Sequence, residues 1–212
     1  MLRLIPWLIL SLLALPLWAA EEEEFIEGIH YERVTPPLPG GSAGKVEVIE
    51  LFWYGCPHCF TFEPKLAAWK KRKADYIEFI SVPAIFNNPL WQLHATAFYT
   101  ADILGVEGQL HEALFRALHV TKRPLKTEQQ LRDFFIEHGI KGEAFDKTFN
   151  SFSVRAKTAR AADLSKKSGI NGVPAVVVNG KFRIDGPLAG GYDNLLKIVD
   201  RLAEQEHLAA TK

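Results

Sequence analysis

The sequence has little cysteine and no net charge. Its 212 residues include two cysteines, and 25 basic side chains balance 25 acidic ones. A small secreted scaffold held by disulfides needs many more cysteines, so that class is excluded. A general nucleic-acid binder carries an excess of basic residues to neutralise phosphates, and this sequence has none. A hydrophobic content of 48% excludes a disordered chain. A globular protein remains, with one domain or one domain that contains a large insertion.

Long apolar runs are missing after the first twenty residues, and those twenty differ from the rest. Sixteen of them are apolar, Arg3 supplies a single positive charge, and Ala19 and Ala20 precede an acidic run. This order predicts a secretory signal peptide over residues 1–20, cleaved near Ala19 or Ala20. The alternative is a retained membrane anchor. The apolar stretch is shorter than the roughly 20 residues that a spanning helix needs, and prolines interrupt it.

The order of the expected elements predicts an α/β fold. Three segments have the β-branched and aromatic composition of strands: residues 46–53, 76–82 and 176–184. The third is a hairpin, because it contains an Asn-Gly turn. A helix is expected from Pro57, and residues 89–167 show helical periodicity throughout. An amphipathic helix, with Asp193 as its expected N-cap, ends the chain.

The two cysteines lie three positions apart, where a strand becomes a helix. Cys56 stands at the helix N-terminus, whose dipole and free N–H groups lower the pKa of a thiol. We expect Cys56 to be exposed and nucleophilic, and Cys59 to be buried and to resolve the mixed disulfide. His58 can donate a hydrogen bond or a charge to the Cys56 thiolate. Pro57 suits the first helical turn, where its missing N–H costs nothing.

The cysteine pair also has two non-catalytic interpretations, a structural disulfide and a zinc site. A structural disulfide with a two-residue spacer closes too small a loop to stabilise the chain much. Structural zinc takes four ligands, and the sequence has no second CxxC and no close histidine pair to complete the set. We therefore expect a catalytic pair and no metal. The four histidines of the helical segment are expected to be packed or solvated: His94, His111, His119 and His138.

Glu50 is a carboxylate in a strand that should be buried, in phase with Val46 and Val48. Burial of such a group is costly unless it has a partner or a raised pKa. The functional hypothesis is a proton relay that serves Cys59 during exchange. The alternative is an ion-paired glutamate or one that faces an edge. Glu63 lies on a helix turn that should be exposed, so we expect it to be solvated and not catalytic.

The segment Gly55-Cys56-Pro57-His58-Cys59 after an apolar strand resembles the active-site motif of the thioredoxin superfamily. Its Pro-His pair is similar to that of DsbA-type thiol:disulfide oxidoreductases, and the likeness covers almost all of the chain after the leader. It includes the segment Gly172-Val173-Pro174-Ala175 before the hairpin. The resemblance implies a redox-active Cys56–Cys59 disulfide. It also implies a cis Val173–Pro174 peptide that lies against the disulfide and helps to bind extended substrate chains.

The resemblance implies a thioredoxin-like fold with a helical domain inserted into it. Residues 21–88 and 168–212 then form the two parts of the thioredoxin-like domain, and residues 89–167 form the insertion. The implied activity is that of a periplasmic dithiol oxidase, which acts on reduced, unfolded exported proteins. A quinone-linked membrane partner of the DsbB type would re-oxidise it. We expect no cofactor and no nucleic-acid partner, and a monomeric mature protein.

Two other functions stay open at this point. The first is a periplasmic reductase or isomerase with the same chemistry. The stretch before Val46 is too short for the separate dimerisation domain of the known isomerases, and the reduction potential decides between reductase and oxidase. The second is a non-catalytic peptide or metal carrier that uses the cysteine pair as its binding site.

Overall fold

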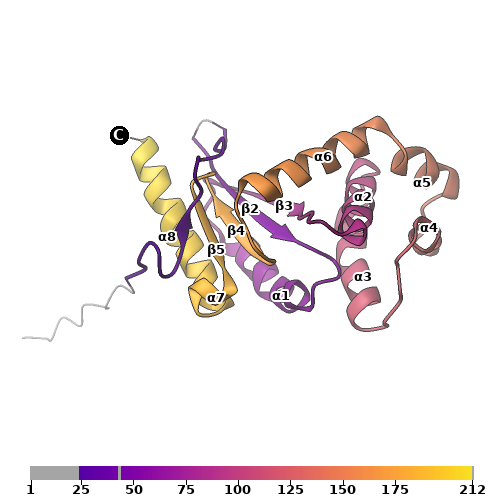
Figure 1. Ribbon diagram of the computed structural model, residues 1–212, viewed down its shortest axis with the longest axis horizontal. Coiled ribbons are helices and arrows are strands. Elements are labelled where there is room, and N and C mark those ends of the chain that lie inside the picture. Colours follow the sequence, from indigo (N-terminus) through magenta and orange to yellow (C-terminus); the bar gives the residue numbers. More distant parts are fainter. Residues whose placement is uncertain (1–23, 43, 212) are drawn as a thin grey trace, which may run out of the picture.

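The computed structural model describes residues 24–42 and 44–211, so the expected signal peptide and its cleavage near Ala19 or Ala20 lie outside the described residues. These described residues form a five-stranded sheet flanked by helices (Figure 1). None of the helices in this described part is long and apolar enough to cross a membrane. The elements in chain order are β1 (Glu32–Arg33), β2 (Val46–Phe52), α1 (Pro57–Arg72), β3 (Ile77–Pro83), α2 (Pro89–Ile103), α3 (Glu107–His119), α4 (Glu128–Glu137), α5 (Gly142–Phe149), α6 (Phe152–Lys167), β4 (Ala175–Val178), β5 (Phe182–Asp185), α7 (Gly186–Ala189) and α8 (Tyr192–Ala210).

The sheet has the strand order β1-β5-β4-β2-β3 and places β2 among its inner strands. Strand β2 runs parallel to β3 and antiparallel to β4. Every residue of β2 except Glu47 is buried, which explains its almost unbroken apolar sequence. The expected hairpin is confirmed as β4 and β5. Its turn residues Asn179 and Gly180 have φ values of 49° and 66°, the left-handed conformation that such a tight turn requires.

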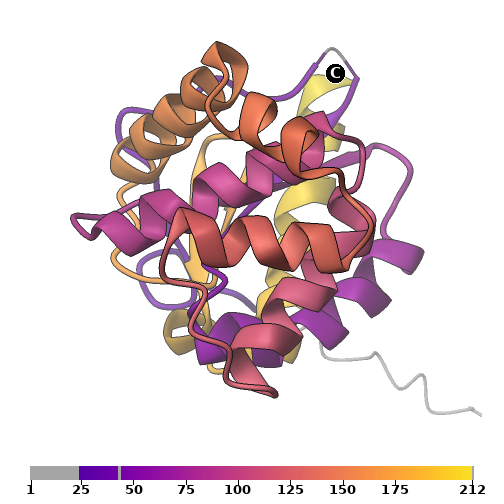
Figure 2. The same cartoon turned by 90° about the vertical axis from the view of Figure 1, so that its right-hand side faces the viewer.

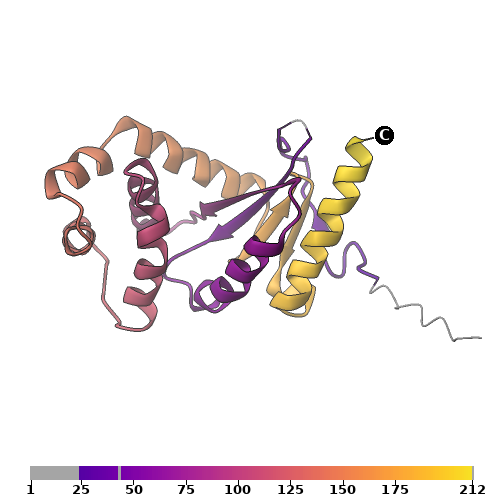
Figure 3. The same cartoon turned by 180° about the vertical axis from the view of Figure 1, so that it is seen from behind.

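Two hydrophobic cores lie on the two faces of the sheet. Helices α1 and α8 cover one face (Figure 3), where Val46 and Val48 pack with side chains such as Trp69 and Leu195. Ile49 and the other core residues of β2 pack toward the block of helices α2 to α6. Alternation along a strand sends successive side chains to opposite faces, so β2 serves both cores. Burying one such large side chain contributes about 1.5–3 kcal/mol.

The helices α2 to α6 form a lobe at one end of the sheet (Figures 1 and 2). The helical prediction for residues 89–167 is confirmed at both ends, since α2 begins at Pro89 and α6 ends at Lys167, but residues 120–127 between α3 and α4 are not helical. Asn88 caps α2 by accepting a hydrogen bond from the N–H of Leu90. Helix α3 packs against α1, the helix that follows the CxxC segment. The lobe therefore closes over the region where the cysteines lie.

The expectation that Asp193 is the N-cap of the last helix is wrong. Gly190 and Gly191 have φ values of 71° and 134°, and this glycine turn starts α8 at Tyr192 with Gly191 as its N-cap. Asp193 therefore lies inside the first turn, where its negative charge still favours the helix dipole. Its carboxylate binds Lys65 of α1 at 2.7 Å and so links the two helices that share one face of the sheet.

Candidate active site

The CxxC segment lies where β2 ends and α1 begins. The N–H of Cys56 donates to the carbonyl of Trp53 at 2.9 Å, which closes a tight turn between strand and helix. A Cβ atom at Gly55 would lie 2.4 Å from Cζ2 of Trp53, so only glycine fits at this point of the turn. Cys56 is the N-cap of α1, and Pro57 follows in its first turn. The sulfur of Cys56 is thus held at a helix N-terminus.

Cys56 carries the more acidic of the two thiols, and both cysteines are unbonded. The pKa of Cys56 is lowered to about 6, chiefly because the Cys59 thiol donates a hydrogen bond to its sulfur. Partial burial opposes this effect. The backbone N–H groups of Cys59 and His58 and the charge of the exposed His58 add to the lowering. The Cys56 sulfur is therefore a thiolate at neutral pH, the form that attacks disulfides.

Cys59 differs from Cys56 in both exposure and acidity. Its side chain is completely buried, which confirms the expectation for this residue. Burial raises the pKa of Cys59 far above its ordinary value, and the neighbouring Cys56 raises it further. Cys59 is consequently a neutral thiol that needs a base before it can attack.

The expectation that Cys56 is exposed is wrong, because 8% of its surface is accessible. The loop before β4 covers it, and the Cys56 sulfur lies 3.3 Å from the carbonyl of Val173, to which it donates when protonated. Pairing of Ala175 with Leu51 holds this loop beside the end of β2. The Val173–Pro174 peptide is cis, as the resemblance implies. The structure thus brings Cys56, Val173 and Pro174 together from segments far apart in the sequence.

Glu50 is fully buried beneath the cysteines, as its phase in β2 predicts. The hydroxyl of Ser81 donates to its Oε2 atom at 3.0 Å, whereas its Oε1 atom has no hydrogen-bond partner among the described residues. Burial raises the pKa of Glu50 to about 8, and repulsion from Glu63 adds to this. The hydroxyl of Ser81 and the charge of Lys70 act in the opposite direction. Glu50 is mostly protonated at neutral pH, and in its ionised form it raises the pKa of Cys59 further.

The expectation that Glu63 is solvated is wrong. Its side chain is 18% exposed, and its Oε1 atom lies 3.4 Å from Nε2 of His111. The other ring nitrogen of His111 lies 3.0 Å from the hydroxyl of Tyr54 and 3.5 Å from Oε1 of Glu107. The cause is helix α3, which carries His111 and packs on the face of α1 that appears free in the sequence. Only the i,i+4 spacing of Glu107 and His111 could have signalled this group.

The other three histidines of the helical lobe are packed, as expected. A ring nitrogen of each lies near a backbone carbonyl: His94 with Leu125 at 3.0 Å, His119 with Tyr54 at 2.8 Å and His138 with Phe134 at 2.7 Å. Across residues 24–42 and 44–211, no three metal-ligating side chains are grouped as a metal site would require.

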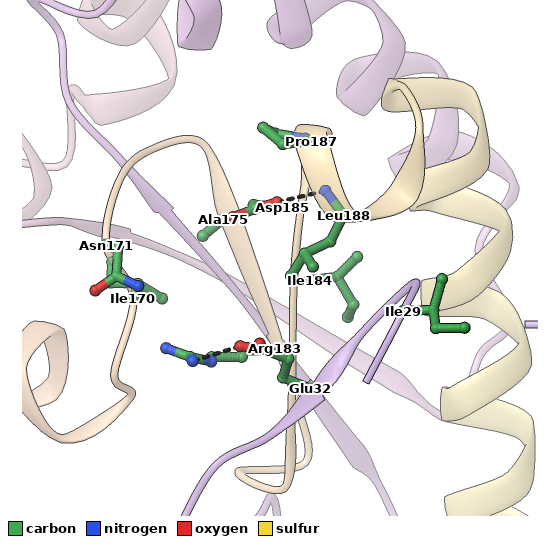
Figure 4. Close-up of a pocket in the computed structure, with 10 residues that line it drawn as sticks. All are labelled: Ile29, Glu32, Ile170, Asn171, Ala175, Arg183, Ile184, Asp185, Pro187 and Leu188. Atoms are coloured by element: carbon green, nitrogen blue, oxygen red, sulfur yellow. Dashed lines mark hydrogen bonds and ion pairs between the residues drawn. The ribbon is translucent and has the colours of Figure 1, made fainter. Parts of the chain in front are cut away.

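A cavity of about 420 Å³ lies at the sheet edge beside β5 (Figure 4). Ala175, the residue after Pro174, is part of its lining, but neither cysteine is. Figure 4 shows Arg183 paired with Glu32 across the strands, and Asp185 accepting from the N–H of Leu188. The cavity is adjacent to the proline loop and separate from the reacting sulfurs.

We expect the thiol of Cys56 in the reduced protein to titrate near pH 6, because its pKa is lowered to that value. A free cysteine titrates at about 8.5. The ultraviolet absorbance of the thiolate, followed against pH, measures this directly. Replacing Cys59 by alanine removes the strongest hydrogen bond to the sulfur and should move the midpoint upward. A midpoint near that of a free thiol in the unaltered protein would contradict the assignment.

These features define a class of protein. A low-pKa cysteine at a helix N-terminus, a buried partner thiol and a cis-proline loop on a mixed sheet form a dithiol–disulfide exchange site on a thioredoxin-like fold. Residues 47–203 match the DSBA-like thioredoxin domain. The chain belongs to this family.

Curated relatives and solved structures agree with this assignment. The thiol:disulfide interchange protein DsbA of Pseudomonas aeruginosa is 39% identical over 194 residues, which cover 92% of each chain. The protein of the same name from Azotobacter vinelandii is 42% identical over 86% of this chain and 85% of its own. The crystal structure of Pseudomonas aeruginosa DsbA matches with a TM-score of 0.83, covering 89% of this chain and 97% of that one. The DsbA structure from Xylella fastidiosa gives a TM-score of 0.78 at 34% identity, covering 84% and 96%.

Proposed function

We propose that this thiol:disulfide oxidoreductase works as an oxidant, which passes a Cys56–Cys59 disulfide to substrate proteins. The observation that carries the proposal is the unequal acidity of the two sulfurs, with the pKa of Cys56 lowered and that of Cys59 raised. A stabilised Cys56 thiolate favours the reduced protein over its disulfide form. The disulfide is therefore given up readily to reduced substrates.

The reaction moves two electrons from a substrate dithiol to the cysteine pair. A substrate thiolate attacks the sulfur of Cys56, the Cys56–Cys59 bond breaks, and Cys59 leaves with the electron pair. Glu50, protonated at neutral pH, gives its proton to the Cys59 sulfur. The second substrate thiolate then attacks the substrate sulfur of the mixed disulfide and releases Cys56 as a thiolate. The products are a substrate disulfide and the reduced enzyme.

Neighbouring residues have positioning roles in this proposal. His58 stabilises the Cys56 thiolate through its N–H group and its charge, and Pro57 sets the first turn of α1. The loop at Val173 and Pro174 lies against Cys56, so an extended substrate chain can pair with its backbone while its thiol approaches the sulfur.

We further propose that the protein acts in the periplasm after removal of a signal peptide. Its substrates there are reduced, unfolded exported proteins. A quinone-linked membrane oxidase of the DsbB type restores the disulfide, and the mature protein works as a monomer. The naming of the curated relatives as DsbA supports this cycle, because an oxidant that is used once per substrate needs a partner that regenerates it.

The redox equilibrium with glutathione tests the direction of the reaction. We expect the protein to stay reduced in strongly oxidising glutathione buffers, with a potential above about −200 mV. A potential near the roughly −270 mV of thioredoxin would indicate a reductase and contradict the proposal. The matched variant is Cys56→Ser, which should oxidise no reduced test protein. A non-catalytic carrier would show no oxidation by the unaltered protein either.

A further inference from the structure

Glu63 of α1, together with His111 and Glu107 of α3, forms a row of ionisable side chains whose first member acts on the buried Glu50. We propose that Glu63, His111 and Glu107 form the path along which protons pass between Glu50 and the surface. This inference rests on the proposed function, in which Glu50 exchanges protons with Cys59. It gives these three residues a positioning role in proton delivery and adds no group that touches the substrate.

The geometry of the row fits a path from the interior to solvent. His111 lies between two carboxylates, with Nε2 at 3.4 Å from Glu63 and Nδ1 at 3.5 Å from Glu107. Side-chain exposure is 18% for Glu63, 12% for His111 and 37% for Glu107, so the row ends at the surface. The hydroxyl of Tyr54, 3.0 Å from Nδ1, holds the ring in place. Each ring nitrogen therefore faces one carboxylate.

The inner end of the row is marked by unpaired oxygens. The Oε1 atoms of Glu50 and Glu63 are both buried, and the part of the chain that the structure describes supplies neither with a hydrogen-bond partner. Such atoms are costly and rare in folded proteins. Glu63 is also the charge that acts most strongly on Glu50. A site that must hold and release a proton explains why the buried carboxyl of Glu50 is kept under the influence of the half-buried Glu63.

A histidine in the middle of the row suits this task. Imidazole titrates near neutral pH, and it can accept a proton at one nitrogen while it releases one from the other. When the reduced enzyme is re-oxidised, the proton of Cys59 goes to the ionised form of Glu50. It then moves to Glu63, across the ring of His111 to Glu107, and into water. During substrate oxidation the same path runs inward.

A second route to Glu50 competes with this row. A cavity of about 740 Å³ is lined by Lys70 of α1 and Ser81 of β3, which both act on Glu50, and also by Glu107. Water in that cavity could reach Glu50 through the hydroxyl of Ser81. That hydroxyl already donates to Oε2 of Glu50, and a serine hydroxyl does not gain or lose a proton near neutral pH. The row through His111 consists of side chains that can take up and release a proton.

The test is oxidation of the reduced full-length protein by oxidised glutathione. Cys56 first attacks glutathione disulfide and releases one glutathione thiolate, at a rate proportional to the glutathione concentration. Cys59 then attacks the Cys56 sulfur and expels the second glutathione, and its own proton leaves through Glu50. At high concentration the observed rate reaches a plateau that reports only this second step. The two steps are thus separated within one experiment.

We expect His111→Gln to lower the plateau at least tenfold and to change its pH profile, since general acid–base catalysis contributes on the order of 10²-fold or more. Added imidazole should restore the rate. The concentration-dependent first step should stay unchanged, which shows that the protein is folded. Glu63→Gln, which leaves the ring of His111 in place, should lower the plateau in the same way. Glu112→Gln, an exposed change on the same helix, is the matched control.

Three results would overturn the path. The first is an unchanged plateau in His111→Gln. The second is a plateau that falls in Ser81→Ala and not in His111→Gln, which would assign the proton to the cavity. The third is slow resolution that ignores imidazole and keeps its pH profile, because His111 would then only pack against Phe52 and Phe115. Excess oxidised glutathione with no reduced glutathione present oxidises even a strongly oxidising dithiol, so the unaltered protein should react. Failure of the proposed function would appear separately, in the unaltered protein, as a potential near the roughly −270 mV of thioredoxin for a reductase, or as no reaction for a carrier.

Discussion

Cys59→Ser is expected to remain covalently attached to proteins that contain disulfides. In this variant the Cys56 thiolate attacks a substrate disulfide and forms a mixed disulfide, while the other substrate sulfur leaves as a thiolate. The variant lacks the Cys59 thiol, which would otherwise attack the Cys56 sulfur and release the substrate. The intramolecular attack by Cys59 benefits from a very high effective concentration. Its loss should lengthen the life of the mixed disulfide by on the order of 10³-fold or more.

Non-reducing electrophoresis of the variant with a disulfide-containing test protein measures this directly. The adduct should appear as a band of summed mass that disappears on reduction. The matched variant is Cys56→Ser, which should form no adduct because its remaining sulfur is completely buried and its pKa is raised. Adducts on Cys56→Ser that equal those on Cys59→Ser would show that the roles of the two sulfurs have been assigned the wrong way round.

Glu50→Gln is expected to make the reduced protein more stable at pH 7 by roughly 3 kcal/mol and to leave its stability at pH 4 almost unchanged. In the folded protein the pKa of Glu50 is raised from 4.5 to about 8. Between these values the unfolded chain releases a proton that the folded chain keeps. The free energy of unfolding of the unaltered protein is therefore not reduced by Glu50 below pH 4.5, and it falls as the pH rises from 4.5 toward 8. Glutamine does not titrate, so the free energy of unfolding of the variant does not fall in this way.

Urea unfolding of both proteins at pH 4 and at pH 7 measures the effect. The charge control is Glu112→Gln, whose exposed side chain should show no comparable dependence on pH. A gain for Glu50→Gln that is equal at both pH values would mean that burial does not hold the proton on this carboxyl.

The variant should also resolve mixed disulfides slowly, because Cys59 loses its base. A carboxylate kept at a cost in stability is typical of functional sites.

Local patterns predicted much of this protein. The CxxC segment at a strand–helix junction indicated the reacting sulfurs, and the alternation of β2 indicated that Glu50 is buried. The Asn-Gly turn gave the hairpin because its backbone conformation is a property of those two residues. Each of these conclusions depends on neighbours within a few positions in the chain.

Other features depend on contacts that neighbours in the chain do not determine. Cys56 is covered because Val173, 117 positions later, lies against it. Glu63 is half-buried because α3 packs on α1, and the sequence of α1 is equally suited to a helix with that side in water. The sequence predicts only an ordinary packed or solvated histidine at His111, since nothing local places it beside two carboxylates. These positions follow from how the lobe closes on the sheet.

Both sulfurs are unbonded in a fold whose two cores are complete. The chain therefore needs none of the cross-links that it is proposed to install in others. A newly made molecule can fold without an oxidant and without an older copy of the protein to assist it. A catalyst that needed its own product in order to fold would be lost when a cell ran out of it, whereas this one folds first and then needs an oxidant only to become active.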